Sequence, residues 1–143
     1  MKYQWQFEEM KELVLAAKGP EDVRPRVVIG LHKSFPRHMP ARRAESCTRP
    51  VTGQADGSHQ RTGRHGICGA APASRKTEVV LDVDADARYL AYSLETHSEI
   101  VVPVIKGGAL WGEIDIDSDR PDAFGSDDVE FLEAVARLLS ERL

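Results

Sequence analysis

The stretch HSEIVVPVIKGGALWGEIDIDSD, residues 97–119, places two runs of β-branched and other apolar residues on either side of a glycine pair. Short apolar runs of this composition, bounded by turn residues, are typical of β-strands. Gly107 and Gly108 can adopt the positive φ angles that a two-residue turn requires. The stretch therefore predicts an antiparallel hairpin. Pro103 has no N–H to donate to the ladder, which predicts an edge, a bulge or an outward-facing position there.

Three acids accompany this hairpin. Asp115 and Asp117 are two positions apart and share one face of the strand, whereas Ile114 and Ile116 take the other face. If Glu99 lies across the hairpin, the three carboxylates converge, and a ligand ammonium group or a metal ion would then offset their mutual repulsion. The pattern alone also fits acids that face solvent on a half-exposed sheet.

Helical periodicity precedes the strands. Within residues 3–18 the apolar side chains recur every three or four positions until a Gly-Pro pair stops the pattern, which predicts an amphipathic helix. A second helix is predicted over residues 21–35, where Pro25 and Gly30 weaken the pattern. Pro25 is compatible with this helix if it lies in the first turn.

A third helix is predicted at the C-terminal end. Asp127, three residues before Glu130, forms a capping signature. The apolar face of this helix comprises Phe131, Leu132, Val135, Leu138 and Leu139. With a strand over residues 77–83, the order of helices, strands and helix predicts an α+β domain. We expect an antiparallel β-sheet with N- and C-terminal helices packed on one face.

Composition limits the classes of function. The chain has 143 residues, 41% of them hydrophobic, which fits a single domain with one core. The net charge of -4 and the lack of a basic face argue against nucleic acid as a partner. No secretory signal and no run near ~20 apolar residues is present, so we expect a cytoplasmic protein with no membrane partner. Two cysteines, Cys47 and Cys68, fit a reducing compartment. No zinc spacing occurs around His97, and Gly107 and Gly108 form a turn rather than a phosphate cradle, so no metal and no cofactor is expected.

Five motifs carry a resemblance to a known family: GICGAA, TEVV-DV, SEIVVP, GEIDIDS and DAFGSDDVEFLEAVARLLS. In order and spacing they resemble the GAF domain of the free methionine-(R)-sulfoxide reductase family, strongly over residues 63–143 and weakly over the leading helices. The resemblance implies one GAF-like domain over residues 1–143, in which 1–36 form the N-terminal helices and 67–143 the well-matched core and C-terminal helix. It also implies that the acids of SEIVVP and DIDS hold the amino-acid end of free methionine sulfoxide. Those ligand-binding acids are Glu99, Asp115 and Asp117.

The cysteines depart from the family pattern. The resemblance implies that Cys68 is one redox cysteine and that the nucleophile stands 24 residues later, where this chain has Tyr92. A phenol can neither attack a sulfoxide as a thiolate does nor be resolved as a disulfide. Cys68 is therefore a candidate catalytic residue, and the alternative is that it is a small buried hydrophobe. Cys47, in SCTRPVTG, faintly resembles an upstream C-T-R-I-P stretch of the family, but its spacing to Cys68 differs.

Residues 37–66 are the second departure. They hold only Met39 and Val51 as sizeable aliphatic side chains and show no strand or helix period, which predicts a loop or disorder. Relatives have apolar strands and an aromatic-rich wall in this region. Either the segment is a divergent loop, or its frame is shifted between about Arg37 and about His65. Resequencing the gene across it distinguishes the two.

Three functions follow as hypotheses. The favoured one is a GAF module that binds a small amino-acid-like ligand without turnover, as a signalling sensor or a degenerate enzyme. The second is an active reductase that uses Cys68 with Cys47 or another resolving thiol and a thioredoxin-type reductant. The third is a structural module that forms a homodimer through the apolar faces of residues 10–17 and 131–139.

Overall fold

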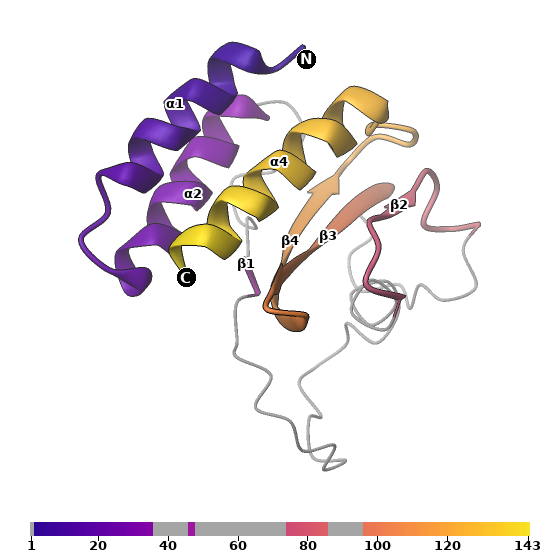
Figure 1. Cartoon of the computed structure of the whole chain (residues 1–143). Helices are drawn as coiled ribbons and strands as arrows, with labels where there is room; N and C mark the ends of the chain where they lie inside the picture. Colours follow the sequence, from indigo (N-terminus) through magenta and orange to yellow (C-terminus); the bar gives the residue numbers. More distant parts are fainter. Residues whose placement is uncertain (1, 36–45, 48–73, 86–95) are drawn as a thin grey trace.

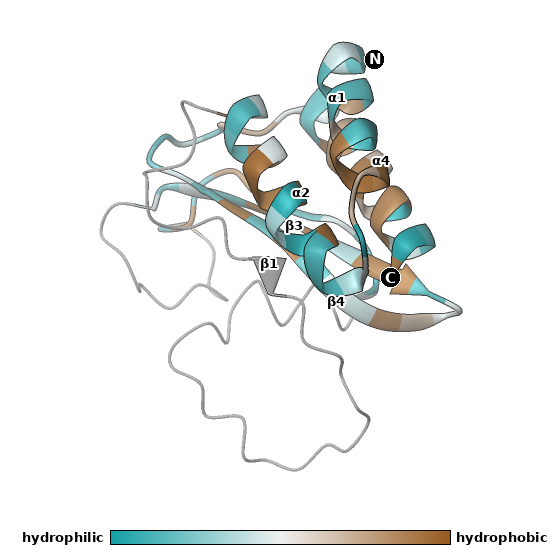
Figure 2. Cartoon of the chain, turned by 90° about the vertical axis from the view of Figure 1, so that its left-hand side faces the viewer, coloured by the Kyte–Doolittle hydropathy of each residue, from teal (hydrophilic) through white to brown (hydrophobic). Residues whose placement is uncertain are grey.

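The computed structural model describes residues 2–35, 46–47, 74–85 and 96–143 (Figure 1). Most of the atypical segment 37–66 lies outside these residues, as do the GICGAA motif and the stretch around Tyr92. In the described part, three helices cover one face of an antiparallel sheet, which Figure 2 shows from the side. The predicted α+β architecture, with helices from both ends of the chain on one face, is confirmed.

The hairpin forms as the sequence predicts. Strand β3 spans Ser98–Lys106 and strand β4 spans Ala109–Ser118, paired antiparallel over their whole length. Between them Gly107 and Gly108 adopt φ angles of 58° and 77°. These angles suit glycine because it has no Cβ to clash in the left-handed region.

The sheet has the order β1-β4-β3-β2 in the described residues. Strand β2, Glu78–Val80, pairs with Glu99–Val101 of β3 and ends there. Pro103 therefore lies past the end of β2, and a register shift in the β3–β4 pairing follows directly after Val104. A proline is tolerated at such a position because no described strand pairs with β3 there on the side of β2, and the ladder is irregular beyond it.

The core lies between the sheet and the C-terminal helix α4, Ser126–Arg142. Four of the five predicted apolar residues of this helix are 0–2% exposed, and Leu138 is partly buried: Phe131, Leu132, Val135 and Leu139 form the buried set. They pack on the isoleucine and valine side chains that β3 and β4 direct to this face. The amphipathic pattern of the last helix is thus confirmed.

The predicted cap of α4 is wrong by two residues. The N-cap is Gly125, whose backbone N–H donates to Oδ2 of Asp128 at 2.7 Å. Asp128, at the third helical position, reaches back to the cap in the geometry expected of Asp127 with Glu130. A carboxylate there also interacts favourably with the positive end of the helix dipole.

The N-terminal helices pack against α4 and each other. Helix α1 spans Gln4–Leu15 and α2 spans Pro20–Ser34. Gly30 of α2 lies against Met10 of α1, where an added Cβ would come within 2.7 Å of the Met10 Cε. Gly30 therefore permits close helix packing. Pro25 lies in the second turn of α2 rather than the first, so it removes one backbone hydrogen bond that burial of neighbouring residues offsets.

Tyr3 joins the start of the chain to the start of α4. Its hydroxyl donates to Oδ1 of Asp128 at 2.5 Å, and its ring lies 5.0 Å from that of Phe131 and 5.6 Å from that of Phe35. Burial raises the pKa of Tyr3 well above its usual value, and the bond to Asp128 raises it further. Asp128 thus accepts two hydrogen bonds, one from each end of the fold.

This contact gives a stability prediction. Tyr3→Phe keeps the ring but removes the hydroxyl, and we expect a loss of about 1–2 kcal/mol from the free energy of unfolding. Because the folded pKa of Tyr3 is raised, its contribution is fully present below the unfolded pKa of 10.0 and decreases as the pH rises above that value. Urea unfolding should therefore show that the free energy of unfolding decreases less in Tyr3→Phe than in the wild type when the pH is raised from below 10 to above 10. An equal decrease in both would contradict the assignment.

No helix among the described residues is both long enough and apolar enough to cross a bilayer.

Candidate ligand site on the hairpin

The sheet register brings the three predicted acids together. Glu99 on β3 lies directly opposite Asp117 on β4, and Asp115 lies two positions along the same strand, opposite Val101. Paired residues share a face of the sheet, and so do residues two apart. One carboxylate oxygen from each of the three acids lies within 4.8 Å of the others. The predicted convergence of Glu99, Asp115 and Asp117 is therefore present in the structure.

The acids lie on the face of the sheet away from the helices. Ile100, Ile114 and Ile116 alternate with them and enter the core under the helices, with exposed fractions of 0–2%. The period of two along each strand separates the two sets. The hairpin therefore has an apolar face in the core under the helices and an opposite face that carries the acids.

Two of the three acids are buried, which excludes the alternative that all three face solvent on a half-exposed sheet. Glu99 and Asp115 are each 5% exposed, and Asp117 is half-buried. Buried carboxylates at this separation repel each other more strongly than they would in water, because the surroundings screen them less. Acids that merely faced solvent would not be enclosed in this way. A cation placed among the three, either an ammonium group or a metal ion, would relieve the repulsion.

Glu113 is a fourth acid on this face, buried, that the sequence analysis did not name. It is 7% exposed and lies two positions before Asp115, so it shares the acidic face of β4. The signal was present in the sequence as the alternation of Glu113, Asp115 and Asp117. The group of three converging oxygens does not include Glu113.

The cysteines are placed only in part. Cys68 and Tyr92 lie outside the described residues. Strand β1, Ser46–Cys47, pairs antiparallel with β4, and the backbone of Cys47 lies opposite Glu113. His97, discounted as a metal ligand, is not in the group of converging acids.

Comparison with known proteins agrees with this fold. The GAF domain family model matches residues 25–143, which is most of the chain. The protein therefore belongs to the GAF domain family.

Individual proteins that are similar to this chain include free methionine-R-sulfoxide reductases. Free methionine-R-sulfoxide reductase of Saccharomyces cerevisiae is 42% identical over 77 residues, which cover 53% of this chain and 43% of that protein. GAF domain-containing protein A of Dictyostelium discoideum is 37% identical over 90 residues, which cover 63% of this chain and 56% of that protein. The chain thus spans about half the length of these curated relatives. The X-ray structure of free methionine-R-sulfoxide reductase from Neisseria meningitidis in complex with its substrate has a TM-score of 0.75 and 26% identity, with coverage of 98% of this chain and 87% of that one.

Proposed function

We propose that this GAF domain binds a small amino-acid-like ligand, such as free methionine sulfoxide, and does not turn it over. The observation that carries the proposal is the convergence of Glu99, Asp115 and Asp117 on the buried acidic face of the hairpin. Three carboxylates fit the ammonium group of a free amino acid, which can donate three hydrogen bonds and carries the opposite charge. Relatives that are named as reductases of the free sulfoxide support this ligand class.

The proposed absence of turnover follows from the lack of a cysteine at the position of the nucleophile. Tyr92 occupies the position that the family resemblance assigns to the attacking cysteine. Reduction of a sulfoxide by this chemistry requires a thiolate that attacks sulfur and is then oxidised to a sulfenic acid. A domain with this substitution retains the acids for binding and functions as a sensor or as a degenerate enzyme.

Calorimetric titration with free L-methionine (R)-sulfoxide tests the proposal. We expect saturable binding at one site per chain, with no methionine formed when a thiol reductant is present. N-acetylated methionine sulfoxide is the matched control, because it lacks the ammonium group and should bind far more weakly. No heat at millimolar free sulfoxide, or equal binding of the acetylated form, would rule out the proposed site.

A second candidate is an active reductase that uses Cys68 and Cys47. The pairing of β1 with β4 favours it, because it brings the backbone of Cys47 to the strand that carries Asp115 and Asp117. One thiolate would attack the sulfoxide sulfur, release methionine and become a sulfenic acid. The second thiol would form the disulfide and release water, and a thioredoxin-type reductant would reduce the disulfide. Methionine formation that is lost in Cys68→Ser would support this candidate over the first.

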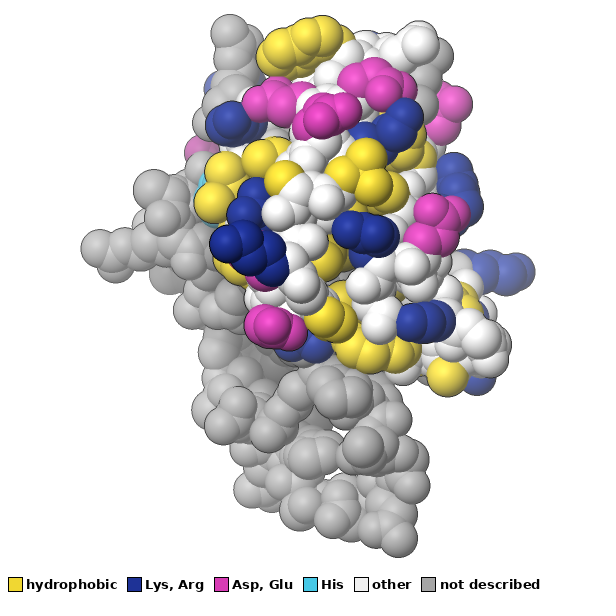
Figure 3. All heavy atoms as spheres, turned by 60° about the vertical axis from the view of Figure 1, so that its left-hand side comes forward, with side chains coloured by type: hydrophobic (Ala, Val, Ile, Leu, Met, Phe, Trp, Pro, Cys, Tyr) yellow, Lys and Arg dark blue, Asp and Glu magenta, His cyan; other side chains and the backbone are white. Residues whose placement is uncertain are grey.

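A homodimer is a further proposal, on different residues from those first expected. The apolar faces of residues 10–17 and 131–139 are largely used within one chain, since Met10, Val14 and Phe131 are 0–1% exposed. The large hydrophobic side chains that remain exposed on α1 and α2 are Trp5, Leu15 and Ile29. Figure 3 shows hydrophobic side chains on this side of the molecule in several groups among basic and acidic ones. Sedimentation of the wild type and of Trp5→Ala would test whether they form an interface.

A further inference from the structure

A groove opens beside the edge of the sheet, between β2 and α4. Its volume is about 470 Å³, within the range of small-ligand sites. Val79 of β2, Pro103 of β3 and Val129 of α4 form its apolar lining. Val79 packs on the helix side of the sheet, opposite Ile100, whereas Glu99 and the other acids lie on the far side. None of Glu99, Asp115 and Asp117 lines the groove.

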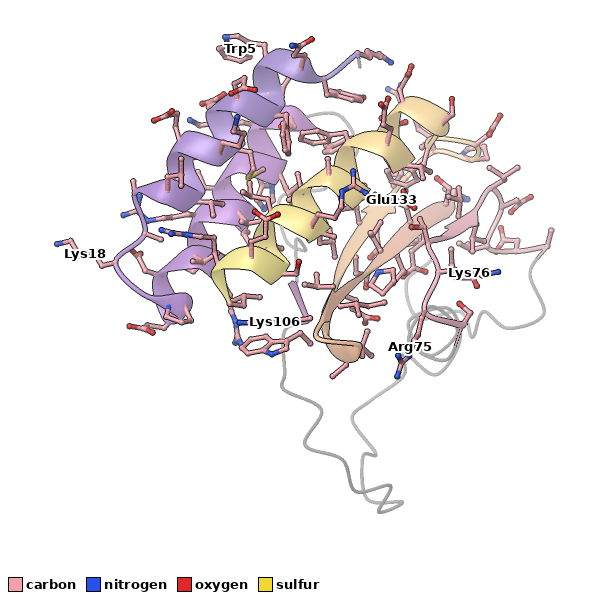
Figure 4. The ribbon with its side chains drawn as sticks, in the orientation of Figure 1. Trp5, Lys18, Arg75, Lys76, Lys106 and Glu133 are labelled. Carbon is pink, nitrogen blue, oxygen red and sulfur yellow. The ribbon has the colours of Figure 1, made fainter. Side chains whose placement is uncertain are left out.

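Two cations border one side of the groove. Arg75 and Lys76 are adjacent, lie on the segment that leads into β2, and form no ion pair with any acid in the described residues (Figure 4). Arg75 has a φ of 58°, and its Nη1 donates to the carbonyl oxygen of Gly108 in the hairpin turn. This bond holds the guanidinium in place and leaves its other N–H groups for a ligand. An anion at this end of the groove would therefore find two positive charges.

A single carboxylate borders the other side. Glu133 of α4 lines the groove, and its Oε1 accepts a hydrogen bond from the Thr77 hydroxyl at 2.6 Å. The bond fixes the carboxylate without neutralising it, because a hydroxyl carries no charge. Figure 4 shows Glu133 on α4 and Lys76 on the facing segment. The groove thus has opposite charges on its two sides and an apolar surface between them.

We propose that this groove binds a short aliphatic peptide with free ends. The C-terminal carboxylate would lie at Arg75 and Lys76, the N-terminal ammonium group at Glu133, and an aliphatic side chain on the apolar lining. A ligand with two opposite charges and an apolar centre complements the groove, whereas a simple fatty acid or amine would match only one side. The extended backbone of a peptide also suits a wall formed by an edge strand. This site is independent of the function proposed for the hairpin acids.

NMR titration with the tripeptide Ala-Val-Ala tests the proposal. We expect shifts in the amide signals of Val79 and Val129 that saturate with peptide concentration. N-acetylation and C-terminal amidation each remove one charge, and each should weaken binding by about two- to fivefold, the value of an exposed charge pair. No shifts at about 10 mM peptide, equal binding of the capped peptides, or shifts at Asp115 in place of Val79 would overturn the proposal.

Matched variants test which charged residue of the groove binds each end of the peptide. Glu133→Gln keeps an oxygen that can accept the Thr77 hydroxyl, so it should fold normally, bind the free peptide more weakly and no longer distinguish the acetylated form. Lys76→Gln should bind the free peptide more weakly, and C-terminal amidation should weaken its binding less than it does in the wild type. Lys106→Gln, an exposed cation at the hairpin turn that does not line the groove, is the control and should bind as the wild type does. Equal affinity in Glu133→Gln, Lys76→Gln and Lys106→Gln would show that the groove charges do not select the ligand.

Discussion

Asp115→Asn should reduce the affinity for free methionine (R)-sulfoxide by roughly tenfold to a hundredfold. Asp115 is one of three acids that converge within 4.8 Å, and it is 5% exposed. A hydrogen bond to a charged group contributes about 1.5–3 kcal/mol, and the loss of this amount corresponds to the stated range. The measurement is the dissociation constant from calorimetry, in the wild type and the variant under the same conditions.

The same variant should be more stable without ligand than the wild type. Removing one of three neighbouring negative charges lowers the repulsion that folding has to overcome, and a gain of about 1 kcal/mol in the free energy of unfolding is expected. Binding and stability would then change in opposite directions, as at many functional sites. Asp119→Asn is the control, because this acid is exposed just after β4 and should change neither quantity. If Asp115→Asn bound as tightly as Asp119→Asn, the acidic face would not be the ligand site.

Phe131→Ala should cost about 3–5 kcal/mol of folding stability. Phe131 is fully buried, and its ring lies 5.0 Å from that of Tyr3 and 5.8 Å from that of Phe35. The deletion leaves a cavity where α1, α2 and α4 meet, so the loss of contacts adds to the lost hydrophobic transfer energy. The free energy of unfolding of a domain is only about 5–15 kcal/mol in total, so a large shift of the urea midpoint is expected.

Leu138→Ala is the comparison for this prediction. Leu138 lies on the same helix and is only partly buried, so its truncation should cost about 1 kcal/mol. Urea unfolding followed by circular dichroism measures both. Equal losses in the two variants would mean that the aromatic cluster around Phe131 does not dominate the packing of the helices.

The local part of the fold could be predicted from the sequence. The hairpin depends on a glycine turn and two apolar runs within residues 97–119, and α4 depends on a periodic apolar face. Both patterns involve neighbours in the chain, where rules of spacing apply directly. The convergence of Glu99 with Asp115 and Asp117 could be stated only as a condition, because it needs the hairpin register. A shift of one residue would have moved Glu99 to the other face.

Contacts between distant residues could not be predicted in this way. The bond from Tyr3 to Asp128 joins positions 125 residues apart, and no spacing rule connects them. Gly125 and Asp128 also take the capping roles predicted for Asp127 and Glu130, because the position of the helix start depends on the turn before it. Arg75 and Glu133 come from different elements, so their position on the same groove could not be predicted from spacing.

The wide separation of Tyr3 and Asp128 has a consequence for the order of folding. The hairpin closes over a two-residue turn, and such units form within about 1–10 μs. Docking of α1 instead requires closure of almost the whole chain, which is costly in entropy until the sheet and α4 exist. We therefore expect α1 to dock after the transition state, so that Tyr3→Phe accelerates unfolding and leaves the folding rate unchanged. Stopped-flow kinetics would reveal this as a φ-value near zero, and the N-terminal helix would then be the first element to detach when the folded protein opens.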